Sequence, residues 1–317
     1  LKDSKVGCYV GRLCVAAVAY ADDIVLLAPS VRAMRLLLNV CDEFAFKYDV
    51  VFNACKSKCL IFNPSGGRQL HSDYLPTINF CIGDKKIEFV DSWPHLGHVL
   101  NVNRDDGADM DKTRTVLSGQ INNVLCYFGH VFPVLKLSLI KTFCYSLYGS
   151  VLWQLDHSKL EALCTTWRKG LRRVWNLPYQ THCNILPILC NCLPLYDEIV
   201  KRTANFINQC LNSDCVLVNQ IVHHSIYFER ARSPVGRNAL SYCLKYHASN
   251  IQSVNSNTIH NCFFRSIDEE LLNKVLVLME LIFIRDGSFE AIALGAAPLF
   301  ARQDLISFIA SICTYID

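Results

Sequence analysis

Two adjacent carboxylates interrupt an apolar stretch near the start of the chain. Asp22 and Asp23 lie between the apolar runs 13–19 and 24–28. This pattern predicts a buried hairpin with both acids at its tip. Two carboxylates isolated there would lose their hydration and repel each other unless a cation neutralised them. The most suitable cation is Mg²⁺, which binds one or two carboxylates together with phosphate oxygens of a substrate.

The chemistry that such a site supports is phosphoryl transfer. With two metal ions, one activates an attacking 3′ hydroxyl group and the other stabilises the leaving pyrophosphate. Adjacent residues of a regular strand point to opposite faces, so a turn is needed to bring the carboxylates together. Most Asp-Asp pairs are solvated turns, and the metal site therefore depends on the flanking strands, the preceding Tyr20 and the following helix. Small residues leave room for a nucleotide beside the tip: Ala16, Ala17, Ala19 and Ala21.

A capped helix and further strands follow the acidic pair and would position it. Ser30, after Pro29, is the expected N-cap of a helix over residues 30–46, where apolar residues recur three and four apart. A loop is expected at residues 64–67, of sequence Pro-Ser-Gly-Gly. Strands are predicted at residues 50–52, 59–62, 78–82, 87–90 and 93–100, the last interrupted at Gly97.

From residue 105 onward the hydrophobic period becomes that of helices. Two further helices are predicted at residues 135–152 and 160–175. The segment 102–107, rich in Asn, Asp and Gly, is the predicted domain boundary. The fold class is therefore α+β, with antiparallel strands and one long helix followed by a mostly helical part. The first helical stripe consists of Met110, Leu117, Ile121, Val124 and Phe128.

The composition limits the classes of protein to consider. The 317 residues are 51% hydrophobic and 19% charged, which excludes a disordered chain and supplies large cores. A net charge of +3 excludes a uniformly basic coat for nucleic acid but allows a local basic face. The longest stretches without charged residues are broken by prolines or are too short for a membrane span. We therefore expect no membrane partner.

The 17 cysteines could indicate zinc, disulfides or packing. Their number is odd, and Cys-x-x-Cys does not occur in the sequence. Cys55/Cys59, Cys190/Cys192 and the pair His223–His224 are the nearest to ligand clusters, but none has a second pair at zinc-finger spacing. We therefore expect no zinc, and reduced thiols buried as small hydrophobes. This predicts a reducing intracellular compartment, the cytoplasm or the nucleus.

Ordered motifs over residues 7–100 resemble the palm of reverse transcriptases of non-LTR (LINE-type) retrotransposons. Tyr-Ala-Asp-Asp is followed by Ile-Val-Leu-Leu-Ala-Pro-Ser, then by the predicted helix and by Val-Phe-Asn-Ala-Cys-Lys-Ser. The segment Trp-Pro-His-Leu-Gly-His at 93–98 is similar to that family's element that grips the primer. The similarity is thinner over 105–210, and we recognise none after about 250. The resemblance implies a partial palm over 1–104, thumb-like helices over 105–155 and a helical carboxy-terminal region over 156–317.

The resemblance also implies roles for individual residues. Asp22 would be the ligand shared by both Mg²⁺ ions, with Asp23 as its partner. Tyr20 would line the primer terminus and the incoming nucleotide. Lys56 matches the lysine near the triphosphate, which donates a proton to the pyrophosphate, and Lys58 is the alternative.

A further element would hold the primer. The resemblance assigns this role to His95, Leu96 and Gly97, with Gly97 needed because the backbone must turn or approach closely there. An ordinary bulge is the simpler explanation of Gly97.

The sequence also departs from the family. Its members need another catalytic Asp on an upstream strand, together with the fingers, whereas this chain begins at Leu1 just before the acidic hairpin. We therefore expect a fragment that does not polymerise DNA alone, although the complete enzyme would use Mg²⁺, an RNA template, a DNA primer and deoxynucleoside triphosphates. A non-enzymatic nucleic-acid-binding remnant and a decayed element are the alternatives. The sequence leaves the oligomeric state open.

A basic segment in the helical half is a candidate contact for the nucleic-acid backbone. It comprises Arg168, Lys169, Arg172 and Arg173, flanked by Trp167 and Trp175. The arginines and lysine would contact phosphates while the tryptophans stack on bases. A solvated basic face with both tryptophans in the core explains the same pattern, and the sequence does not choose between them.

Overall fold

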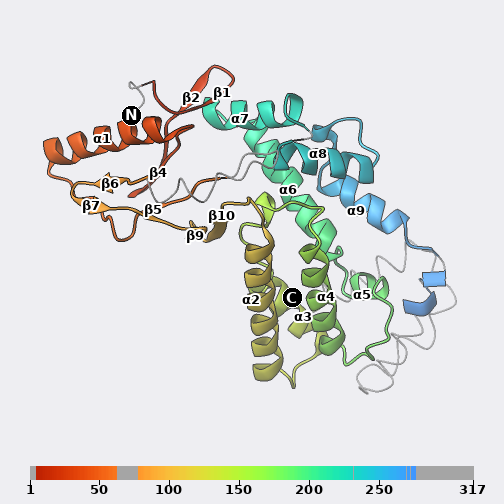
Figure 1. The fold of residues 1–317 in the computed structure, drawn as a ribbon. Helices are drawn as coiled ribbons and strands as arrows, with labels where there is room; N and C mark the ends of the chain where they lie inside the picture. Colours follow the sequence, from red (N-terminus) through yellow and green to blue (C-terminus); the bar gives the residue numbers. More distant parts are fainter. Residues whose placement is uncertain (1–4, 63–77, 231, 269, 272, 276–317) are drawn as a thin grey trace. The chain divides into compact units, whose positions relative to one another are not determined.

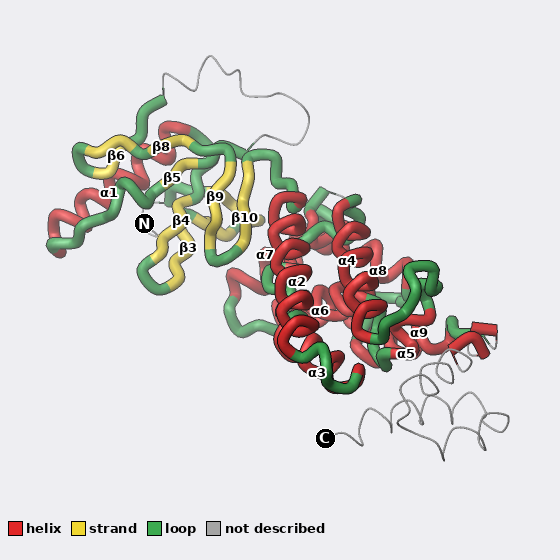
Figure 2. Tube along the Cα trace, turned by 90° about the horizontal axis from the view of Figure 1, so that it is seen from below, coloured by secondary structure: helices red, strands yellow, loops and turns green. Residues whose placement is uncertain are grey.

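The computed structural model describes residues 5–62, 78–230, 232–268, 270, 271 and 273–275. The predicted loop at 64–67 and the chain after 275 lie outside the described residues. The fold is mixed helix and strand, about 52% helical with small sheets, which agrees with the predicted α+β class (Figure 1). Figure 2 shows strands only in the first part of the chain, and the last described strand ends at Asn101.

The chain divides into two compact units. Unit 1 comprises the described residues up to Asp106 together with Cys210–Glu229. Unit 2 comprises Gly107–Gln209 and the described residues from Arg230 onward. The sequence analysis places a boundary at 102–107, but it did not associate Cys210–Glu229 with the amino-terminal part.

The strands of unit 1 pair two by two within the described residues. Four pairs are antiparallel, and the pair β5–β8 is parallel. The pairs are β1 (Cys8–Val10) with β2 (Leu13–Val15), β3 (Ala17–Tyr20) with β4 (Asp23–Leu26), β5 (Lys58–Cys59) with β8 (Glu88–Phe89), β6 (Cys81–Ile82) with β7 (Lys85–Lys86), and β9 (Ser92–His95) with β10 (His98–Asn101).

The apolar run 13–19, predicted as one strand, is divided between β2 and β3. The division falls at Ala16, whose carbonyl accepts a hydrogen bond from Leu27 N–H at 2.8 Å. The backbone at Gly7 also approaches Ala16 so closely that a Cβ on Gly7 would lie 2.7 Å from Ala16 Cα. The predicted strand at 50–52 is absent, and the segment 93–100 is a hairpin rather than one strand.

The predicted capped helix is confirmed as α1 (Val31–Tyr48). The Ser30 side chain accepts a hydrogen bond from Ala33 N–H at 3.2 Å, and the helix ends at Asp49 in left-handed conformation. α1 packs on the 78–89 region, where Leu38 forms a core with Phe80 and Ile87. The last helix of unit 1, α7 (Val216–Tyr227), contacts β1.

Unit 2 is built from helices. The predicted stripe is confirmed in the first of them, because Met110, Leu117, Ile121 and Val124 are buried, whereas Phe128 is exposed. The predicted helix at 135–152 is shorter than expected, since α3 ends at Phe143 and left-handed residues at Leu147 and Gly149 follow. The α-helices are α2 (Gly107–Tyr127), α3 (Pro133–Phe143), α4 (Lys159–Val174), α5 (Ile185–Leu189), α6 (Leu195–Leu211), which leads into unit 1, α8 (Pro234–Lys245) and α9 (Ser256–Arg265).

Helices α2 and α4 approach closely at a glycine. A Cβ on Gly170 of α4 would lie 2.7 Å from Cδ1 and 3.2 Å from Cγ2 of Ile121 on α2. Gly119, on α2, has open space around the corresponding position. Only one of these two glycines is therefore required by packing.

We predict that alanine stabilises the protein at Gly119 but not at Gly170. Gly119→Ala should raise the free energy of unfolding by up to about 1 kcal/mol, because alanine favours helix without meeting a neighbour. Gly170→Ala should lack this gain, since Ile121 must move, and Gly170→Val should cost about 1–3 kcal/mol through overpacking. Urea denaturation of the three variants would measure these effects, and a stabilising Gly170→Val would contradict the packing.

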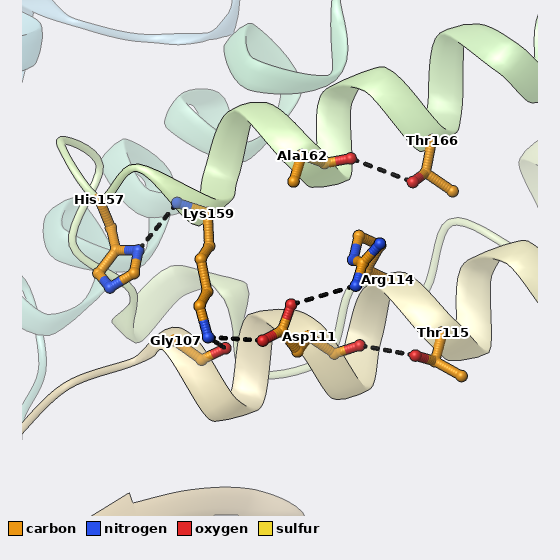
Figure 3. Close-up of polar contacts among 8 residues, drawn as sticks. All are labelled: Gly107, Asp111, Arg114, Thr115, His157, Lys159, Ala162 and Thr166. Atoms are coloured by element: carbon orange, nitrogen blue, oxygen red, sulfur yellow. Dashed lines mark hydrogen bonds and ion pairs between the residues drawn. The ribbon is translucent and has the colours of Figure 1, made fainter.

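An ion pair joins the amino-terminal parts of α2 and α4 (Figure 3). Lys159 Nζ lies 2.6 Å from Asp111 Oδ2, and Arg114 Nη2 lies 3.4 Å from Asp111 Oδ1. The hydrogen bond from Lys159 lowers the pKa of Asp111 below its ordinary value of 3.8. The side chains of Lys159 and Asp111 are 44% and 41% exposed, so their pairing contributes little to stability.

The stabilising effect of Asp111 should depend on pH. Folding lowers its pKa, so its contribution is complete above about pH 4 and is lost as the pH falls through the folded-state pKa. Asp111→Asn should therefore be slightly less stable than the wild type at pH 7, with the difference vanishing in acid. Thermal unfolding from pH 7 to pH 2 would measure it, and a constant difference would argue against this linkage.

Candidate functional site

The acidic pair lies at the tip of the β3–β4 hairpin. Tyr20 pairs directly with Asp23, so Ala21 and Asp22 form the turn. Ala21 has φ 53°, in the left-handed region that costs an ordinary residue roughly 1–2 kcal/mol. Such strain often occurs at functional sites. The tip thus brings together Tyr20, Asp22 and Asp23, as the sequence analysis required.

The prediction that this hairpin is buried is wrong. Tyr20 is 67% exposed, and both Asp22 and Asp23 are exposed. β3 and β4 pair only with each other within the described residues, which leaves most of the ribbon open to solvent. Exposed carboxylates keep their hydration, so desolvation does not by itself demand a cation at this tip.

The two carboxylates still fit part of a metal site. Adjacent acids at the tip of a hairpin can bind a hard cation whose other ligands are water and phosphate oxygens. Among the described residues, no three His, Cys, Asp or Glu side chains converge to hold a metal ion. The tip therefore suits one ion, and a two-ion site needs a further carboxylate.

The two candidate lysines differ in their surroundings. The Lys56 side chain is exposed, and its backbone N–H donates to Asn53 Oδ1 at 3.1 Å. Lys58 Nζ lies 2.5 Å from Glu88 Oε2 and 5.4 Å from the centre of the Trp93 ring. Lys58 thus holds neighbouring strands together, and Lys56 is the lysine whose side chain faces solvent.

The primer-holding candidates lie together at the turn of the β9–β10 hairpin. His95 pairs with His98, and the turn consists of Leu96 with φ 46° and Gly97 with φ 83°. Positive φ at both central residues is the requirement of a type I′ turn. Gly97 therefore serves a tight turn, as one of its predicted explanations proposed, and not a bulge.

The basic segment lies on α4, and its tryptophans are in the core. Trp167 is 1% exposed and Trp175 is 8% exposed, so neither can stack on a base. The alternative explanation, in which both tryptophans lie in the core, is therefore correct.

The three arginines of this segment bind groups within unit 2. Arg168 pairs with Glu161, and Arg173 donates to Asn122 Oδ1. Arg172 donates twice to the Thr181 carbonyl, at 3.2 Å from Nε and 2.8 Å from Nη2. Lys169 is exposed.

The 16 cysteines among the described residues are free thiols. Burial raises the pKa of Cys59 to about 11 and is the main cause of the pKa of about 12 at Cys164, so both thiols stay protonated at neutral pH. The prediction that the thiols are buried holds for only part of the set, because five are exposed: Cys55, Cys81, Cys126, Cys183 and Cys215.

Helix α7 carries a ring cluster that the sequence analysis missed. It noted His223 and His224 only as metal ligands, although Tyr227 and Phe228 follow each of them four residues later. That spacing places each pair on one helical face, and it was the signal for a cluster of rings.

Comparison with known proteins adds no assignment, since no protein-family model and no curated protein matches this chain. Within the described residues, no helix is both long enough and apolar enough to cross a bilayer.

The β9–β10 turn gives a direct prediction. Leu96→Asn should raise the free energy of unfolding by about 1 kcal/mol, because asparagine tolerates left-handed backbone better than leucine. Leu96 is 43% exposed, so little apolar burial is lost. Urea denaturation would measure the change, with Leu36→Asn, at an exposed site in α1, as a control expected to destabilise. A destabilising Leu96→Asn would show that the leucine side chain packs more than its exposure indicates.

Proposed function

We propose that this chain carries the acidic hairpin and the primer-holding hairpin of an RNA-directed DNA polymerase of the non-LTR retrotransposon type. The observation that carries the proposal is the tip of β3–β4, where a strained two-residue turn places Asp22 beside Asp23. The order of motifs along residues 7–100 supports the same assignment.

In this proposal Asp22 and Asp23 hold Mg²⁺, and Tyr20 borders the primer terminus. When bound, the metal supplies a Lewis acid that stabilises charge on phosphate oxygens. Lys56 extends toward the triphosphate of the incoming deoxynucleotide, and the turn His95-Leu96-Gly97 holds the DNA primer against its RNA template.

A complete two-ion site would need a further carboxylate besides Asp22 and Asp23. The tip suits one ion, and a second ion needs a third acid that does not converge on it among the described residues. We therefore expect this chain alone to bind one metal ion at the tip and not to extend a primer.

The basic segment of α4 has a smaller part in the proposal than its sequence indicates. Lys169 is exposed and suited to a phosphate contact, whereas Arg168 and Arg172 bind groups within their own unit. A phosphate would have to replace those contacts, which reduces what the arginines contribute to binding.

Titration with Mn²⁺ as a paramagnetic substitute for Mg²⁺ would test the metal assignment. In ¹H–¹⁵N spectra of the chain, the amide signals of Ala21, Asp22 and Asp23 should broaden first. Asp22→Asn should weaken this broadening several-fold, because one of the two anionic ligands is lost.

A matched control is another adjacent acid pair, Asp42 and Glu43, on α1. Glu43→Gln should leave the broadening at the tip unchanged, since Glu43 lies on a regular helix outside the hairpin. Broadening that survives Asp22→Asn and Asp23→Asn together would contradict the proposed function.

A further inference from the structure

We infer that Cys190 and Cys192 form a reversible redox site, in which oxidised glutathione converts the two thiols into an intramolecular disulfide. Both residues lie in unit 2, in the turn that follows α5. The site uses neither the acidic hairpin nor a metal ion, so it goes beyond the proposed polymerase function.

The backbone of this turn brings the two cysteines together. Asn191 N–H donates a hydrogen bond to the Ile188 carbonyl at 3.0 Å. Cys192 N–H donates to the Pro187 carbonyl at 2.9 Å. With Asn191 in left-handed conformation at φ 42°, these two bonds form the Schellman motif that ends many helices. The two cysteines are the residues on either side of its left-handed position.

The separation of the two backbones suits a disulfide. The left-handed conformation is the mirror image of the α-helical one, so it places the Cα atoms of its two neighbours roughly 5.4 Å apart. Disulfides join Cα atoms that are about 4.4–6.8 Å apart. The side chains also turn toward each other, because the Cys192 side chain forms a hydrogen bond with the Cys190 thiol.

Side chains from other elements hold the turn in place. Lys141 of α3 donates from Nζ to the Cys190 carbonyl at 2.9 Å and to the Asn191 carbonyl at 3.4 Å. The side chain of Trp175, at the end of α4, interacts with the Cys190 thiol. The two thiols therefore lie side by side in a fixed turn before any oxidant arrives.

The two thiols differ in their access to solvent. Cys190 is 0% exposed, whereas Cys192 is partly exposed. Burial is the main reason why the pKa of Cys190 lies well above its ordinary value, and the Lys141 ammonium group acts in the opposite direction. Cys192 is therefore the thiol that meets the oxidant, and Cys190 is the thiol that completes the disulfide.

The reaction is two successive thiol–disulfide exchanges. The Cys192 thiolate attacks one sulfur of oxidised glutathione, forms a mixed disulfide and releases one glutathione thiolate. That thiolate takes up a proton as Cys190 loses one, and the Cys190 thiolate then attacks the Cys192 sulfur and displaces the second glutathione. The pair loses two electrons and two protons, and glutathione gains them. Excess reduced glutathione reverses both steps, as expected of a redox-sensing pair in a reducing compartment.

Mass spectrometry of the whole native chain, equilibrated in a series of glutathione redox buffers, would test the site. After acid quenching and alkylation, the peptide with Cys190 and Cys192 should lack two hydrogens and carry no alkyl group. Half-oxidation of the pair should need at least about 10-fold less oxidised glutathione than half-modification of the exposed Cys183, because an intramolecular partner acts at high effective concentration.

Three variants separate the pair from other thiols. Cys190→Ala should leave Cys192 as a mixed disulfide with glutathione, whereas Cys192→Ala should leave the buried Cys190 reduced. Cys144→Ala, which removes another buried cysteine of unit 2, should still form the disulfide. The inference is overturned if the wild type accumulates the mixed disulfide at Cys192, if Cys192 pairs with another cysteine, or if both thiols stay reduced in oxidised glutathione alone.

Discussion

Two-residue turns that contain left-handed residues position the candidate residues of the β3–β4 and β9–β10 hairpins in unit 1. Ala21 takes this conformation at the first hairpin, and Leu96 and Gly97 take it at the second. Each turn sets the register of its ladder, so that Tyr20 faces Asp23 and His95 faces the first residue of β10. Because side chains alternate between the faces of a strand, a shift of one residue would reverse the side to which each of them points. The proposed chemistry therefore depends on turns that are locally unfavourable.

Unit 2 depends on polar contacts made by buried side chains. The Trp153 indole N–H donates to Asp109 Oδ2 at 2.7 Å, in the first turn of α2, where the helix dipole also favours a negative charge. Asn238 of α8 accepts from Leu155 N–H at 2.9 Å and donates to the Trp153 carbonyl at 2.7 Å. These bonds join elements far apart in the sequence and satisfy groups that would otherwise be buried without partners.

Contacts within unit 2 also explain why the basic segment of α4 is less available to bind phosphate groups than its sequence indicates. The amphipathic pattern directs Trp167 and Trp175 into the core, and the arginines beside them lie close to carbonyl and carboxylate groups of their own unit. A count of charges along a helix does not measure the positive potential that a nucleic acid would meet. In helix α7, by contrast, the segment between residues 216 and 228 has no charged side chain and still exposes the rings of Tyr227 and Phe228.

The sequence by itself determined the elements whose causes are local. The Ser30 side chain caps the start of α1 by accepting a hydrogen bond from Ala33 N–H. The apolar stripe from Met110 to Val124 defines the buried side of α2. Gly97 adopts the left-handed backbone that the β9–β10 turn requires. Only the tertiary structure decided that the β3–β4 ribbon is exposed, that Ala16 separates two strands, and which groups the arginines bind. Burial and pairing depend on residues distant in the chain, and local periodicity carries no information about those partners.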